Sequence, residues 1–256
     1  MSSLQNRPVQ KSYGQYCDVE CGRATEFWHD QPVDHDLAER VRRAIYDSFA
    51  SHGHPPSHQQ IRDLGAVDEA RISEAVAELA AQRHLVLDQS GNIVMAHPFT
   101  AVNLGFSVMG ARTLWWGGCA WDSFAIPNLV ENEPSVLIAT ACPGCRRALA
   151  WTVTRSGPPE GSEVAHFLVP MDKVWNDVVY ACSNQRLFCS EECVHAWLTS
   201  TGHAKGYIMD LATLWRLASG WYDGRLDSPY RRKDPQSAAD YFRSVGLHGR
   251  FWGLTD

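Results

Sequence analysis

The stretch that decides the fold of the second half of the chain is residues 115–129, WWGGCAWDSFAIPNL. It is almost wholly apolar and aromatic, yet it places Cys119 three residues before Asp122. At that spacing, on a turn or at the start of a helix, the two side chains can face one another. An apolar wall keeps water from both groups, which disfavours their charged forms and raises both pKa values.

The Cys119 and Asp122 pair allows two interpretations. A carboxyl that is partly protonated near neutral pH can donate a proton, and a buried thiol binds a soft electrophile as its thiolate. The pair therefore suits a reaction in which sulfur captures a soft atom and a proton is delivered beside it. The alternative is structural: Cys119 is a small buried apolar residue and Asp122 caps a helix. These two residues alone favour the structural alternative.

The residues that flank this stretch predict an α+β fold. Runs rich in Val, Ile, Leu, Thr and Trp indicate a mainly antiparallel sheet, and two later segments have the pattern of short helices. The strand candidates are residues 106–118, 135–142, 147–157 and 165–170, and the helix candidates are 191–202 and 210–224. We assign residues 99–226 to this catalytic domain and 227–256 to a C-terminal helical extension.

The first part of the chain has a different pattern. Residues 1–33 are polar and without periodicity, and we expect a flexible arm there. Residues 34–98 predict three helices followed by two short strands, which is the order of a winged-helix domain. That fold often binds DNA, but the third helix carries Asp68, Glu69, Glu74 and Glu78, whereas phosphate binding needs positive charge. A structural role is therefore the stronger expectation.

Composition bounds the function further. The chain has 256 residues, a net charge of −6 and no apolar run of membrane-spanning length. We expect a cytoplasmic protein with a small-molecule partner, without membrane or nucleic-acid partners, and the oligomeric state stays open. For such a chain, its eight cysteines favour metal binding or thiol chemistry over disulfides.

Two cysteine pairs have the spacing of metal ligands. CPGC at 142–145 and FCSEEC at 188–193 predict a zinc site in which Cys142, Cys145, Cys189 and Cys193 give tetrahedral coordination by four sulfurs. Cys189 also stands where a helix is expected to begin, which favours its thiolate. A further pair, Cys17 and Cys21, lies in the N-terminal arm without other ligands nearby.

These motifs together resemble the organomercurial (alkylmercury) lyase family. The resemblance rests on residues 110–153, which contain CAWDSFAIP and the strand that leads into the Cys-Pro turn, and on 184–203 and 207–226. It implies protonolysis of a carbon–mercury bond that gives a hydrocarbon and Hg(II), without an organic cofactor. It also implies that Cys119 takes the organic mercury compound, Cys189 joins it on the metal and Asp122 transfers the proton.

Two alternatives stay open. If the four cysteines hold zinc, Cys189 is occupied, and the chain would be a zinc-binding lyase homologue that acts on another thiophilic or carbanion-forming substrate. A winged-helix regulator that responds to metal is the third hypothesis, and the acidic third helix argues against it.

Overall fold

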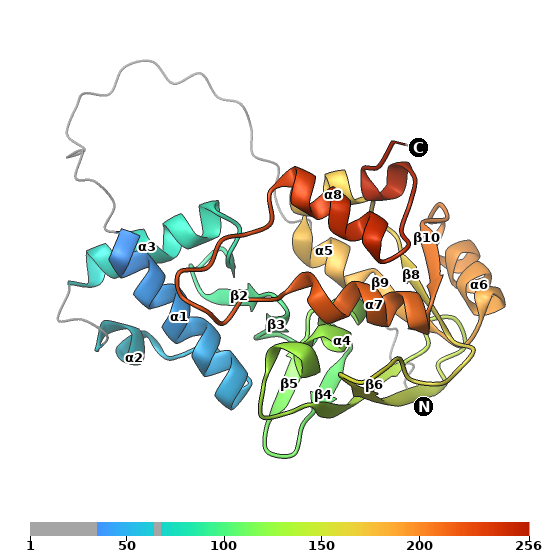
Figure 1. Cartoon of the computed structure of the whole chain (residues 1–256), viewed down its shortest axis with the longest axis horizontal. Helices are drawn as coiled ribbons and strands as arrows, with labels where there is room; N and C mark the ends of the chain where they lie inside the picture. Colours follow the sequence, from blue (N-terminus) through green and yellow to red (C-terminus); the bar gives the residue numbers. More distant parts are fainter. Residues whose placement is uncertain (1–34, 64–67, 256) are drawn as a thin grey trace, which may run out of the picture. The chain divides into compact units, whose positions relative to one another are not determined.

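The computed structural model describes residues 35–63 and 68–255, which form helices around two antiparallel sheets (Figure 1). The expected N-terminal arm, with Cys17 and Cys21, lies outside the described residues. In the part that is described, none of the helices has both the length and the apolar character to cross a membrane.

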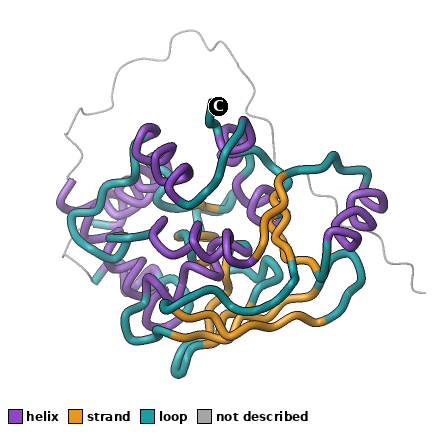
Figure 2. The backbone as a smooth tube through the Cα atoms, turned by 45° about the vertical axis from the view of Figure 1, so that its right-hand side comes forward, coloured by secondary structure: helices purple, strands orange, loops and turns teal. Residues whose placement is uncertain are grey.

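The larger sheet has seven strands, and each described pair of neighbours is antiparallel. In spatial order the strands are β1 (Val86–Leu87), β2 (Ile93–Ala96), β3 (Phe99–Thr100), β5 (Leu114–Gly117), β4 (Ser107–Met109), β6 (Ser135–Ala141) and β7 (Ala148–Thr154). Helices lie on one side of the long β6–β7 pair (Figure 2). These observations agree with the predicted α+β class.

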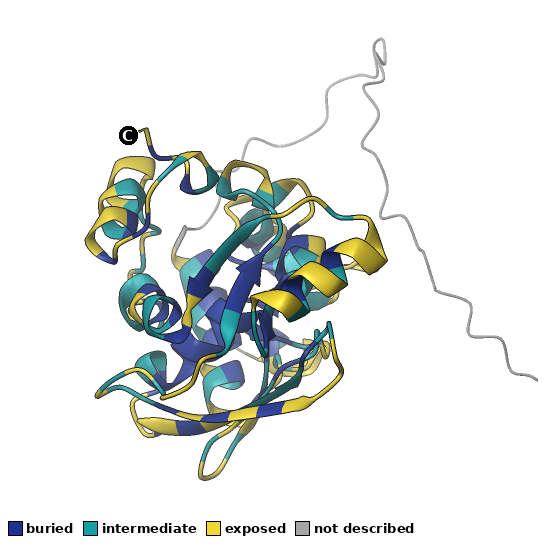
Figure 3. Cartoon of the chain, turned by 90° about the vertical axis from the view of Figure 1, so that its right-hand side faces the viewer, coloured by how far each residue is buried: buried dark blue, intermediate teal, exposed yellow. Residues whose placement is uncertain are grey.

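The alternation of side chains along β6 and β7 explains why these residues form strands at the surface. In β7, Leu149, Trp151 and Val153 are buried, while the residues between them are exposed. This two-residue period places one face on the core and the other in solvent (Figure 3).

The smaller sheet has the order β10 (Tyr207–Asp210), β8 (Val164–Phe167) and β9 (Gln185–Phe188). Strand β9 connects α5 (Val178–Ser183) to α6 (Glu191–Thr201), so it separates two cysteine-bearing segments. The predicted helices at 191–202 and 210–224 are observed as α6 and α7 (Leu211–Trp221).

Helix α4 (Ala120–Leu129) lies in the interior. Residues 120–127 are all buried, which explains why this helix is apolar all round rather than amphipathic. It packs against α7 and contacts strands of both sheets. Its first turn carries Asp122.

The first part of the described chain contains α1 (His35–His52), α2 (His58–Arg62), α3 (Glu69–Ala81) and the β1–β2 hairpin, in the predicted order. The hairpin continues into the large sheet because β2 pairs with β3. Residues 33–256 form one compact unit, so the expected boundary at residue 98 lies between two paired strands. The winged-helix description stays a prediction.

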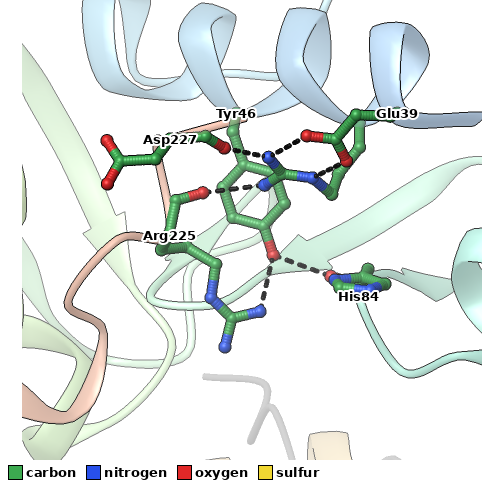
Figure 4. Close-up of polar contacts among 6 residues, drawn as sticks. Glu39, Tyr46, His84, Arg225 and Asp227 are labelled. Atoms are coloured by element: carbon green, nitrogen blue, oxygen red, sulfur yellow. Dashed lines mark hydrogen bonds and ion pairs between the residues drawn. The ribbon is translucent and has the colours of Figure 1, made fainter. Parts of the chain in front are cut away.

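The C-terminal segment contacts both α1 and the interior aromatic residues. Arg42 of α1, which is 1% exposed, forms an ion pair with Glu39 and donates hydrogen bonds to the carbonyl oxygens of Arg225 and Asp227 (Figure 4). Beyond this connection, the segment includes α8 (Pro235–Ser244) and the short 3-10 helix η2 (Arg250–Trp252). Another 3-10 helix, η1 (Met171–Asn176), lies between β8 and α5. Phe242 of α8 stacks on Trp221 of α7 at 5.0 Å between ring centroids.

The Arg42 contacts predict a large effect of substitution. Arg42→Ala removes a buried cation and leaves the carbonyl oxygens of Arg225, which is buried, and Asp227 without their donor, so we expect a loss of about 3 kcal/mol in the free energy of unfolding. Arg43→Ala is the matched control, because Arg43 is 37% exposed and pairs with Asp47 at the surface; its cost should stay below about 1 kcal/mol. Denaturant unfolding measures both, and equal costs would contradict the bridging role of Arg42.

Candidate active site

Cys119 and Asp122 are held together by the start of helix α4. Cys119 is the N-cap residue, and its Sγ accepts a hydrogen bond from the backbone N–H of Asp122 at 3.3 Å. Ser123 fixes the same turn, since its hydroxyl donates to the Cys119 carbonyl oxygen at 2.7 Å. The structure thus confirms that the two side chains meet at the start of a helix.

Two glycines before the cap permit this close packing. A Cβ atom on Gly118 would lie 2.3 Å from Asp122 Oδ2, and one on Gly117 would lie 2.1 Å from Ser123 Oγ. Any larger residue at these positions would displace the first turn of α4 and the carboxyl group.

Both side chains line a cavity of about 830 Å³. Its described lining includes Cys119, Asp122, His97, Cys182 and Tyr222. A second cavity, of about 790 Å³, lies elsewhere, and none of the described residues that line it is a cysteine. The thiol chemistry expected from the sequence therefore belongs to the first cavity.

The Asp122 carboxyl is almost completely buried, at 1% exposure. Tyr222 donates its hydroxyl to Oδ1, while Oδ2 has no hydrogen-bond partner among the described residues. Burial raises the pKa of Asp122 to about 7, although Tyr222, Cys119 and Arg225 act to lower it. The group can therefore accept or donate a proton near neutral pH.

The second thiol at this site is Cys182, which the sequence analysis did not select. Cys119 and Cys182 lie close enough for each thiol to shift the pKa of the other. The reactive groups of Cys182, Asp122 and His97 lie within 4.8 Å of one another, and His97 Nε2 is 3.5 Å from Cys182 Sγ. Cys182 comes from α5, so packing brings it to α4 from a distant part of the chain.

The environment keeps both thiols neutral in the resting site. Burial raises the pKa of Cys119 well above its usual value, and Cys182 and Asp122 add to the effect. The neighbouring Cys119 thiol lowers the pKa of Cys182, but burial and Asp122 outweigh it and the net shift is upward. Burial also lowers the pKa of His97 to about 3, so its ring is neutral at physiological pH.

Arg225 is the buried cation behind the site. Its guanidinium lies 5.2 Å from the centre of the Tyr222 ring and 4.6 Å from that of Tyr230. It also donates to the Tyr46 hydroxyl, which in turn donates to the His84 carbonyl oxygen (Figure 4). Arg225 thus joins the carboxyl site to α1 through tyrosine side chains.

Aromatic residues line another part of the cavity. The ring of Trp121 lies 4.9 Å from that of Trp221 and contacts two further aromatic residues, Phe242 and Trp252. Two arginines, Arg83 and Arg232, stack on another lining residue, Trp175. These surfaces exclude water from the thiols and suit an apolar organic group.

The remaining predicted site residues form a separate group. The sulfur atoms of Cys142, Cys145, Cys189 and Cys193 lie within 4.8 Å of one another. Cys189 was expected to join Cys119, but the structure places it here, with its Sγ 3.4 Å from that of Cys145. Strand β9 lies between Cys182 and Cys189 in the chain, so the two cysteines lie beyond opposite ends of this strand and belong to different sites.

Comparisons with known proteins agree with the resemblance found in the sequence. The family model described as "MerB: Alkylmercury lyase" matches residues 99–223. A solved structure, "Crystal structure of the mercury-bound form of MerB2", is similar with a TM-score of 0.57 and 18% identity, over 77% of this chain and 94% of that chain. The structural likeness confirms the fold, and no curated protein matches the chain.

The buried carboxyl predicts a pH-dependent stability. The folded-state pKa of Asp122, about 7, exceeds the ordinary value of 3.8, so the protonated form favours folding. This contribution is fully present below about pH 4 and is lost as the pH rises through about 7. The stability of the wild type relative to Asp122→Asn should therefore fall by about 4 kcal/mol from pH 4 to pH 8, since one pKa unit is about 1.4 kcal/mol.

Denaturant titrations at several pH values measure this difference. Asp240→Asn is the matched control, because Asp240 lies on the exposed surface of α8. Its curve should follow that of the wild type. A constant difference between the wild type and Asp122→Asn would mean that the carboxyl does not titrate in this range.

Proposed function

We propose that this chain, a member of the alkylmercury lyase family over residues 99–223, cleaves carbon–mercury bonds with Cys119, Cys182 and Asp122. One observation carries the assignment of residues: the buried thiols of Cys119 and Cys182 line one cavity together with the buried carboxyl of Asp122. The sequence gives Cys189 as the second thiol, and the proposal replaces it with Cys182 because Cys189 belongs to the four-cysteine group.

The reaction is a protonolysis in which mercury stays in the +2 state. An organomercurial R–Hg–X and two thiols give R–H, HX and Hg(II) bound by two thiolates. One thiol proton leaves with X, and the other ends on carbon. Mercury is a very soft metal, so sulfur binds it in preference to oxygen or nitrogen.

Asp122 transfers the proton in this scheme. Its carboxylate accepts a proton as Cys119 binds mercury, and its unpartnered Oδ2 can then donate a proton to the leaving carbon. A pKa of about 7 allows both steps without a large energetic cost in either direction. Binding by the second sulfur, Cys182, increases electron density on the carbon that receives the proton.

Tyr222 and Arg225 act on Asp122 rather than on the substrate. The Tyr222 hydroxyl donates to Oδ1, which leaves Oδ2 without a hydrogen-bond partner among the described residues and available for proton transfer. Arg225 stabilises the carboxylate through its charge. We therefore assign Tyr222 as a positioning residue.

The surroundings of the site support two further parts of the proposal. The apolar wall formed by Trp121 and its aromatic neighbours suits small organomercurials with alkyl or aryl groups. The six described cysteines are free, which is the state that a reducing cytoplasm maintains. We keep DNA binding as the weaker hypothesis, because Asp68, Glu69 and Glu74 are exposed on α3 or at its cap.

Substitution of the two candidate second thiols tests the assignment. Cys119→Ser and Cys182→Ser should each lower the rate of hydrocarbon release from a phenylmercury compound by at least ~100-fold. Each substitution removes one sulfur ligand from mercury, so the carbon bound to mercury carries less electron density and is protonated more slowly. Cys189→Ser should retain a rate within about tenfold of the wild type, since it does not line the cavity.

Gas chromatography of the released benzene measures these rates, and circular dichroism confirms that each variant is folded. Full activity of Cys182→Ser together with an inactive, folded Cys189→Ser would assign the second thiol to Cys189. Activity in Cys119→Ser would refute the proposed site altogether.

A further inference from the structure

The four-cysteine group joins two tight turns that are far apart in the sequence. Cys142 and Cys145 lie in the turn that connects β6 to β7, whereas Cys189 follows β9 and Cys193 lies in the first part of α6. The backbone closes the first turn, since the N–H of Arg146 donates to the carbonyl oxygen of Cys142 at 2.8 Å. Each turn thus presents two sulfur atoms to a common centre.

The distances fit a metal ion and exclude a disulfide. The four sulfur atoms lie within 4.8 Å of one another, and Cys145 and Cys189 are separated by 3.4 Å. A disulfide needs about 2.05 Å between sulfurs. Four sulfurs at about 2.3 Å from a tetrahedral zinc ion lie about 3.8 Å apart, which is within the observed range.

The backbone around the group is also adapted to the close approach of the two turns. A Cβ atom on Gly144 would lie 2.3 Å from the carbonyl oxygen of Cys193, so only glycine fits between the turns. The N–H of Cys189 points at Cys142 Sγ at 3.5 Å, a hydrogen bond of the kind that stabilises metal-bound thiolates.

We propose that Cys142, Cys145, Cys189 and Cys193 bind one structural Zn(II), separate from the mercury site. Binding releases the four thiol protons and leaves a closed, four-coordinate site with no position for a substrate. The ion ties the β6–β7 turn to the junction of β9 and α6. Because β9 also follows directly on the segment that carries Cys182, the zinc ion stabilises the region that positions the second reactive thiol.

Metal analysis of the purified chain tests this proposal without any mercury compound. Protein prepared in reducing buffer without chelator should contain about one zinc ion per chain by mass spectrometry. Cys145→Ser and Cys193→Ser should each lose most of it. Cys119→Ser and Cys182→Ser are the matched controls, and they should keep the wild-type zinc content because they lie in the other cavity.

Replacement of zinc by Co(II) in the wild-type protein tests the site even if the cysteine variants do not fold. Wild-type protein produced with Co(II) should show the thiolate charge-transfer and tetrahedral absorption bands of a four-sulfur site. Absence of both zinc and this cobalt spectrum, iron in place of zinc, or full zinc content in Cys145→Ser and Cys193→Ser would overturn the proposal. None of these measurements uses a mercury compound. A failure of the zinc proposal can therefore be distinguished from a failure of the proposed lyase reaction.

Discussion

The burial of one carboxyl group is the constraint on which the site depends. Asp122 lies in the first turn of a helix whose residues 120–127 are all buried, and Tyr222 donates a hydrogen bond to its Oδ1. Water would normally stabilise its charge, and its absence brings the pKa to about 7. Gly117 and Gly118 make this arrangement sterically feasible. Burial of the carboxyl lowers the stability of the fold at neutral pH, and the same burial gives Asp122 the near-neutral pKa that a proton-transfer residue needs.

The same constraint explains the arrangement of the surrounding elements. Helix α4 can be apolar all round only if it is enclosed, and α7 and strands of both sheets enclose it. α7 is followed directly by Tyr222, and the segment beyond it is held to α1 by Arg42. The N-terminal helices thus support the cavity through Arg225 and Tyr46, which is a structural role that needs no DNA contact.

The sequence predicted the parts of the two cysteine sites that depend on residues close together in the chain. Cys119 and Asp122 meet because they are three residues apart on one helical turn, and the four-cysteine group was predictable because each half is a compact pair. Cys182 was missed because nothing near it in the sequence marks it; it reaches Cys119 only through the packing of α5. Cys189 was selected because the family resemblance assigns it the role of the second thiol. The geometry favours Cys182, seven positions earlier, because Cys182 lines the cavity that holds Cys119 and Asp122.

The two cysteine sites differ in what a metal would meet there. At the cavity, two buried thiols are accompanied by a carboxyl and a neutral imidazole, so a soft metal that arrives with an organic group finds two sulfurs and a proton donor. At the turns, four sulfur atoms lie within 4.8 Å of one another. A closed set of four ligands leaves nothing for a substrate to occupy, whereas two ligands leave mercury able to keep its carbon until a proton arrives. The two proposals therefore rest on the number of sulfur ligands at each site and on the presence of a proton donor at only one of them.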